Sequence, residues 1–181
     1  MATGININEM AMATIHCEAC IQAKAVHQSF PKESSTRAEK PGDLTHSDLW
    51  GPAPKASPGG SKYFISFIDD KTRHVTIKFI KSKSDAEHEI QNYVAWIETQ
   101  LGRTPKAFRT DNGGEYIKAK PWLDSKGIEL HVTAPHSPAQ NGVSERQNRT
   151  LAELMRAMLA EKNLPETLWA EAIAHAAYIR N

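Results

Sequence analysis

Hydrophobic and polar residues alternate in short runs along the first half of this chain, and each run predicts a β-strand. Leu44–Trp50 is the first, and it ends at Gly51. Tyr63–Ile68 is apolar enough for a buried strand, and His74–Ile80 alternates between polar and apolar positions. Asp69 opens the short turn that joins the second strand to the third.

A helical period replaces the alternation after the third strand. Ser84 is a predicted N-cap, since Glu87 three residues later completes the spacing of a capping box. Gly102 is the predicted end of this helix. The apolar residues between them share one helical face: Ala86, Ile90, Tyr93, Val94, Ile97 and Leu101.

Strands and helices alternate in the second half. Lys106–Thr110 and Ile128–Val132 are predicted strands, with a helix near Tyr116–Ser125 between them. A polar loop, Thr133–Gly142, leads into a long helix, and Glu166–Arg180 forms the last one. The apolar residues of the long helix recur at helical spacing: Val143, Leu151, Leu154, Met155, Met158 and Leu159. The order of three strands, helix, strand, helix, strand and helix indicates an α/β fold.

Composition limits the number of domains and the bulk charge. A chain of 181 residues with 40% apolar content can build one core with extensions. The predicted parts are an N-terminal segment with a linker (1–40), a core (41–162) and a helical extension (163–181). The net charge of +1 argues against general polyanion binding, so nucleic-acid contacts would need local basic groups. The first residues lack the pattern of a secretory signal, and no run suits a membrane span, so no membrane partner is expected.

Three acidic residues stand at the edges of predicted elements. Asp48 lies in the first strand, Asp111 ends the fourth, and Glu145 lies in the first turns of the long helix. Carboxylate oxygens are the ligands that Mg²⁺ prefers, and a pair of clamped metal ions suits in-line attack on a phosphodiester. Each acid alone could equally be a helix cap or a solvated surface group. Glu115 and the pair Asp69-Asp70 are rival acids, although the first more simply begins a helix and the pair forms a turn.

The sequence motifs around these acids resemble those of a known family. The sequence is similar to copia-type retrotransposon integrases, within the retroviral integrase superfamily of DDE polynucleotidyl transferases. The matching segments are HSDLWGP, SKYFISFIDDKTRH, FRTDNGGEY, GIELHVTAPHSPAQNGVSERQNRTL and LPETLWAEAIAHAAYIRN. The resemblance spans about Cys17 to Asn181. It implies an RNase H-like α/β fold: a five-stranded mixed sheet flanked by helices, with an extended N-terminal segment and an extra C-terminal helix. The 33 residues between Asp111 and Glu145 (112–144) are slightly fewer than usual, which predicts a trimmed loop near Lys118–Trp122.

The resemblance also implies chemistry and partners. Asp48 would bridge two Mg²⁺ or Mn²⁺ ions, Asp111 would bind one and Glu145 the other. The implied reaction is hydrolysis of DNA 3′ ends followed by strand transfer into target DNA. Element ends and target DNA are the implied partners, with a possible RNA contact as part of a Pol polyprotein, and a homo-oligomer is expected. The implied site of action is the nucleus, after a cytoplasmic particle stage.

Several residues near the acids are candidate DNA contacts. Asn141 and Asn148 match family positions that contact DNA ends or support the metal site. Arg146 and Arg149 could bind phosphates through bidentate hydrogen bonds, although charged helix faces are often only solvated. His46 shares a strand face with Asp48, so it is a weaker candidate for supporting the site or touching DNA.

A cysteine pair remains near the start of the chain. Cys17-x-x-Cys20 matches the second half of the family's His-His-Cys-Cys zinc module, and the pattern favours a reducing compartment over a disulfide framework. Tetrahedral zinc needs four ligands. His16 and His27 are nearby, but adjacent His16 and Cys17 make poor chelate geometry, so zinc binding is not expected of this chain.

Two other functions stay open from the sequence. A metal-dependent nuclease on the same RNase H-like fold would cut DNA without joining it. A non-catalytic, integrase-derived fragment would bind nucleic acid or a protein, or do nothing.

Overall fold

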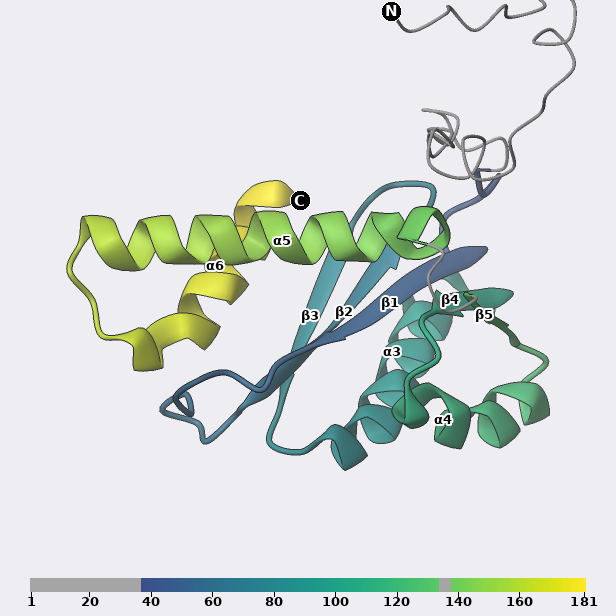
Figure 1. The fold of residues 1–181 in the computed structure, drawn as a ribbon. Coiled ribbons are helices and arrows are strands. Elements are labelled where there is room, and N and C mark those ends of the chain that lie inside the picture. The colour runs from purple at the N-terminus through teal and green to yellow at the C-terminus, as the bar shows by residue number, and fades with distance from the viewer. Residues whose placement is uncertain (1–36, 134–137) are drawn as a thin grey trace, which may run out of the picture. The chain divides into compact units, whose positions relative to one another are not determined.

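The sheet determines where the candidate site residues lie. The computed structural model describes residues 37–133 and 138–181, with only the backbone of 138–141. The described strands form one five-stranded sheet in the order β3-β2-β1-β4-β5. β1, β2 and β3 pair antiparallel, whereas β4 and β5 run parallel to β1 (Figure 1). The bounds are Leu44–Trp50 for β1, Tyr63–Asp69 for β2, Val75–Ile80 for β3, Ala107–Thr110 for β4 and Glu129–Val132 for β5.

Helices cover both faces of this sheet (Figure 1). α3 and α4 lie on one face, and α5 and α6 lie on the other. α5 crosses β1 and β2, and α6 packs on β3 and on α5. The helical bounds are Lys83–Asp85 for η1, Ala86–Leu101 for α3, Gly114–Ser125 for α4, Pro138–Glu161 for α5, Glu166–Leu168 for η2 and Trp169–Arg180 for α6.

The continuous apolar run of β2 follows from burial on both faces. Ile65 and Phe67 pack with Phe108, α3 and α4. Phe64 and Ile68 point the other way and pack with α5 and α6. A strand covered on both sides needs apolar residues at successive positions, not at alternate ones. The five-stranded mixed sheet flanked by helices is therefore confirmed, and the arrangement is an RNase H-like fold.

Apart from shifts of one or two residues at element ends, the local structure differs from the sequence prediction at three places. The capping box is formed by Ser82, the N-cap of the short η1 helix, and Asp85, its third residue, rather than by Ser84 and Glu87. The long helix begins at Pro138, inside the stretch predicted as a loop. The predicted trimmed loop at 118–122 is wrong, because these residues lie within α4.

Some predictions fall outside the described residues, including the linker up to residue 36 and its cysteines. The domain boundaries at 40 and 162 stay predictions, although α6 shares an apolar core with β2, β3 and α5. Among the described helices, none has the length and apolarity needed to cross a membrane.

Candidate metal centre

Asp48 lies in the second half of β1, on the face that α5 covers. Its neighbour across the sheet is Ser66 of β2, whose hydroxyl donates to the Asp48 backbone carbonyl at 3.2 Å. Asn148 of α5 donates from its side-chain nitrogen Nδ2 to Asp48 Oδ2 at 2.9 Å. The Asp48 carboxylate is therefore half-buried and held between the sheet and the long helix.

The electrostatics of Asp48 show which other acids are near. Its pKa is raised from 3.8 to about 6, first because burial disfavours the charged form, and then because of the negative charges of Asp111 and Glu145. The hydrogen bonds from Asn148 and from the Leu49 backbone act in the opposite direction. All three predicted acids therefore interact electrostatically in one region of the molecule.

Asp111 lies in the turn between β4 and α4. Its Oδ1 accepts a hydrogen bond from the Gly113 N–H at 3.0 Å, and its side chain is exposed. A methyl group on Gly113 would meet Asp111 Oδ1 at 3.0 Å and the Glu115 carboxyl at 2.9 Å. The glycine therefore lets the chain pass close to both carboxylates. Glu115 lies in the first turn of α4, as expected from the sequence, and lines a hollow with Lys83 and Lys118.

Glu145 lies on α5 and is exposed. Within the described ranges, no three His, Cys, Asp or Glu side chains are gathered closely enough to hold a metal ion. The close convergence of Asp48, Asp111 and Glu145 therefore stays a prediction.

The residues present nevertheless fit a divalent cation. None of the three acids forms an ion pair with any described Lys, Arg or His, so their negative charge is uncompensated. Asn148 is 5% exposed, and its Oδ1 is buried without a hydrogen-bond partner among the described groups. Oxygen donors with uncompensated charge suit Mg²⁺ or Mn²⁺. The unpartnered amide oxygen is an additional acceptor beside Asp48 among the described residues.

The predicted DNA contacts differ in how exposed they are. Arg146 and Arg149 are exposed on α5, whereas Asn148 is buried against Asp48 and supports the acid directly. The side chain of Asn141 lies outside the described part, as do Cys17 and Cys20 with their neighbouring histidines.

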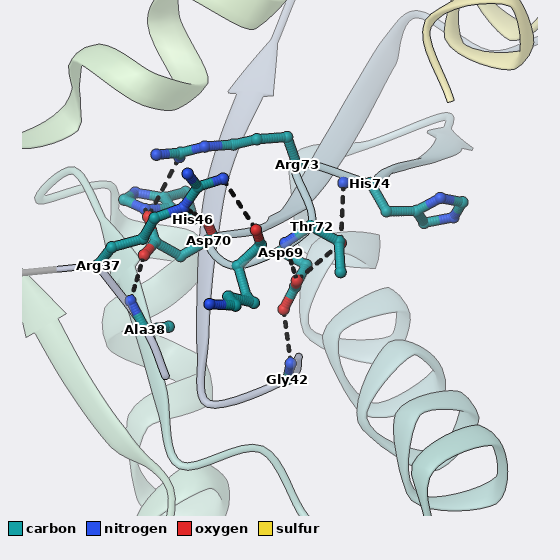
Figure 2. A network of polar contacts seen from close by, with 10 residues as sticks. Arg37, Ala38, Gly42, His46, Asp69, Asp70, Thr72, Arg73 and His74 are labelled. Carbon is teal, nitrogen blue, oxygen red and sulfur yellow. Dashed lines mark hydrogen bonds and ion pairs between the residues drawn. The ribbon is translucent and has the colours of Figure 1, made fainter. Parts of the chain in front are cut away.

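His46 does not face solvent, so its role as a DNA contact is wrong. It is 1% exposed, and its Nε2 donates to Asp70 Oδ1 at 2.8 Å (Figure 2). Burial lowers the pKa of His46, which keeps the ring neutral at pH 7 although Asp70 opposes this effect. A neutral ring that donates from Nε2 leaves Nδ1 as an acceptor, and this atom is buried without a partner in the described structure.

The turn between β2 and β3 contains a polar network that the sequence did not predict (Figure 2). Asp70 Oδ2 accepts the Ala38 N–H at 2.7 Å, and Arg73 donates to Asp70 Oδ1 at 3.1 Å. Asp69 accepts the Gly42 N–H at 2.6 Å and both the N–H and the hydroxyl of Thr72 at 2.7 Å. These two acids therefore fasten the segment before β1 to the sheet. The two consecutive acids beside a strand were the available signal, but their partners are distant in sequence.

The comparisons with known proteins show the fold and the family of this chain. The fold and the carboxylates at its sheet define an RNase H-like protein with a candidate metal centre. The model of the integrase core domain matches residues 38–138, and this chain belongs to that family.

The relatives are larger proteins. The chain is 40% identical over 167 residues to the retrovirus-related Pol polyprotein from transposon TNT 1-94 of Nicotiana tabacum, covering 91% of this chain and 12% of that protein. It is 28% identical to the Pol polyprotein from transposon RE2 of Arabidopsis thaliana, covering 92% of this chain and 11% of that protein. The chain thus spans about an eighth of these polyproteins, and its resemblance to retrotransposon integrases is confirmed.

A solved structure supports the fold. A chain of the simian T-cell lymphotropic virus intasome, solved in complex with PP2A regulatory subunit B56 gamma, aligns with a TM-score of 0.67. The two chains are 23% identical, and the alignment covers 90% of this chain and 56% of that one.

Proposed function

We propose that this chain is the catalytic core of a retrotransposon integrase, which hydrolyses DNA 3′ ends and joins them to target DNA. The observation that carries the proposal is the half-buried Asp48 carboxylate, whose pKa is raised to about 6 by burial and by the charges of Asp111 and Glu145. A group in such surroundings is typical of functional sites.

Asp48, Asp111 and Glu145 would hold two Mg²⁺ or Mn²⁺ ions. When bound, these ions would activate the attacking oxygen and stabilise the leaving 3′ oxygen. Asn148 keeps the Asp48 carboxylate oriented through the bond to Oδ2. Arg146 and Arg149, exposed on the same helix as Glu145, would bind DNA phosphates.

The partners and location follow from the family in the same way. Membership of the integrase core family supports an assembly of several copies on DNA, with element ends and target DNA as substrates. RNA contact within a Pol polyprotein and action in the nucleus are further parts of the proposal. Zinc is not part of it.

Strand-transfer and disintegration assays with Mn²⁺ or Mg²⁺ test the proposal. Asp48→Asn, Asp111→Asn and Glu145→Gln should each abolish joining without unfolding the protein. Glu115→Gln is the matched control, since this acid lies beside Asp111 but outside the predicted trio, and it should retain activity. Unchanged joining in the Asp48 or Asp111 variant would move the site elsewhere.

The runner-up functions give different results in the same assays. A nuclease on this fold would cut both substrates with metal and join neither. A non-catalytic fragment would bind DNA while neither cutting nor joining it.

A further inference from the structure

Ser47 and Tyr116 form a buried hydroxyl pair on the far side of β1 from Asp48. Both residues are 0% exposed, and the Tyr116 phenol oxygen lies 3.0 Å from Ser47 Oγ. Successive residues of a strand point to opposite faces, so Ser47 faces α4 while Asp48 faces α5. The contact therefore joins α4 to the strand position immediately before Asp48.

The contact lies where the sheet no longer connects the two acids. The paired register of β1 and β4 ends at His46 and Arg109, and Asp48 and Asp111 each lie two residues beyond that last pair. No strand pairing between β1 and β4 thus fixes their separation. The Ser47–Tyr116 hydrogen bond connects β1 to α4 just beyond the last paired residues of β1 and β4.

The segment from Asp111 to Tyr116 is itself a closed turn. The Gly113 N–H donates to Asp111 Oδ1 at 3.0 Å, and the Tyr116 N–H donates to the Gly113 carbonyl at 3.1 Å. A displacement of Tyr116 would therefore move the Asp111 carboxylate with it.

We propose that Ser47 and Tyr116 are positioning residues, whose hydrogen bond holds the Asp111 turn against β1 and so presets the separation of the Asp48 and Asp111 carboxylates for a divalent cation. This inference rests on the proposed function. Supporting groups that orient metal ligands commonly change metal affinity by about 10- to 100-fold when they are removed. The phenol also stays protonated: burial raises the pKa of Tyr116 well above its usual value, and the charges of Asp48, Asp111 and Glu115 raise it further.

Calorimetric titration of the full chain with Mn²⁺ tests the inference without relying on activity. Tyr116→Phe removes only the hydroxyl and should weaken Mn²⁺ binding by roughly 10-fold. Ser47→Ala should have the same effect, and the double variant should be no weaker than either single one, because both changes break the same bond. Should Tyr116→Phe fail to fold, the Ser47→Ala variant carries the test.

Tyr93→Phe is the matched control for a purely structural effect. Tyr93 is 2% exposed and stacks on Phe67 with ring centroids 4.2 Å apart, and it belongs to α3, not to β1 or to the Asp111 turn. The control should retain wild-type Mn²⁺ affinity whatever its effect on the thermal midpoint. Wild-type affinity in Tyr116→Phe, or an equal loss in Tyr93→Phe, would overturn the positioning role.

The proposed function is tested separately in the same titration. Asp48→Asn and Asp111→Asn should remove Mn²⁺ binding. If the wild type and these two variants behave alike, the metal centre itself fails and the positioning role fails with it. If only the hydroxyl variants behave like wild type, the metal centre stands and the positioning role alone is lost.

Discussion

Asp48 has an unfavourable charge in the metal-free protein, and this makes stability depend on pH. Its pKa is about 6 in the folded chain against an ordinary value of 3.8, so the folded state binds the proton more tightly. Because the folded state binds this proton more tightly than the unfolded state does, the stability that the group contributes is lost as pH rises from about 4 through 6. A shift of about 2 units corresponds to on the order of 3 kcal/mol.

Asp48→Asn should therefore stabilise the metal-free protein at pH 7 by up to about 2–3 kcal/mol and flatten its pH dependence. Urea unfolding in chelator at pH 5 and pH 7 measures both effects. Asp124→Asn is the control, since Asp124 is an exposed acid paired with Lys120, and it should change little. An Asp48→Asn variant with wild-type pH dependence would show that the charge of Asp48 is not the cause.

Asn148 opposes the pKa shift of Asp48 through its hydrogen bond. Asn148→Ala should raise the pKa of Asp48 above 6 and weaken metal-dependent cleavage, while the fold is kept. Carboxyl-carbon NMR titration in chelator gives the pKa, and Gln147→Ala is the neighbouring control. A lower or unchanged pKa in Asn148→Ala would contradict the orienting role.

At the scale of elements, the turn that follows β2 fastens the chain before β1. Burial alone would raise the pKa of Asp70, but hydrogen bonds from Ala38 and His46 and the charge of Arg73 outweigh it and lower the pKa. A lowered carboxyl pKa contributes stability above pH 4 that is lost as pH falls through the folded value. The ionised Asp70 carboxylate therefore stabilises the fold, whereas the ionised Asp48 carboxylate destabilises it.

Asp70→Ala should destabilise the protein at pH 7 by about 3 kcal/mol, because the His46 N–H and the Ala38 N–H lose their hydrogen-bond acceptor. The deficit should begin to shrink as pH falls below about 4, the ordinary carboxyl pKa, and should keep shrinking as pH falls through the lower pKa of the folded Asp70. Chemical unfolding at pH 7 and pH 3 measures this. Asp85→Ala, which breaks an exposed capping box, should cost only about 1 kcal/mol. An Asp70 variant no weaker than this control would contradict the fastening role.

These elements also show what a sequence can predict. The strands can be predicted because β1 and β2 carry local patterns of apolar residues. The candidate acids can be predicted because each lies within a recognisable sequence motif. The bond between Asp48 and Asn148 joins residues 100 positions apart, and the bond between His46 and Asp70 spans 24. Such pairs depend on sheet order and helix placement, which no local period encodes. The start of the long helix at Pro138 was missed for a local reason: its first turn is polar, so apolar spacing begins later.

At the scale of the whole molecule, a net charge of +1 leaves no general attraction for DNA. Binding must then depend on a few local cations close to the acids, and Arg146 and Arg149 are exposed beside Glu145. Each phosphate contact that is lost should lower the slope of log affinity against log salt by about 1 and weaken binding similarly for all sequences.

Arg146→Ala and Arg149→Ala should therefore each reduce DNA affinity and the salt slope, and the double variant should reduce the slope by about 2. Fluorescence anisotropy on a labelled duplex between low and moderate salt measures the slope in the absence of cleavage. Lys162→Ala is the control, because Lys162 is an exposed cation just past the far end of α5, paired with Glu161. If Lys162→Ala lowers the slope as much as the arginine variants do, DNA binding is spread over the molecular surface. If only the arginine variants lower it, the phosphates lie over the helix that carries Glu145, where the proposed chemistry needs them.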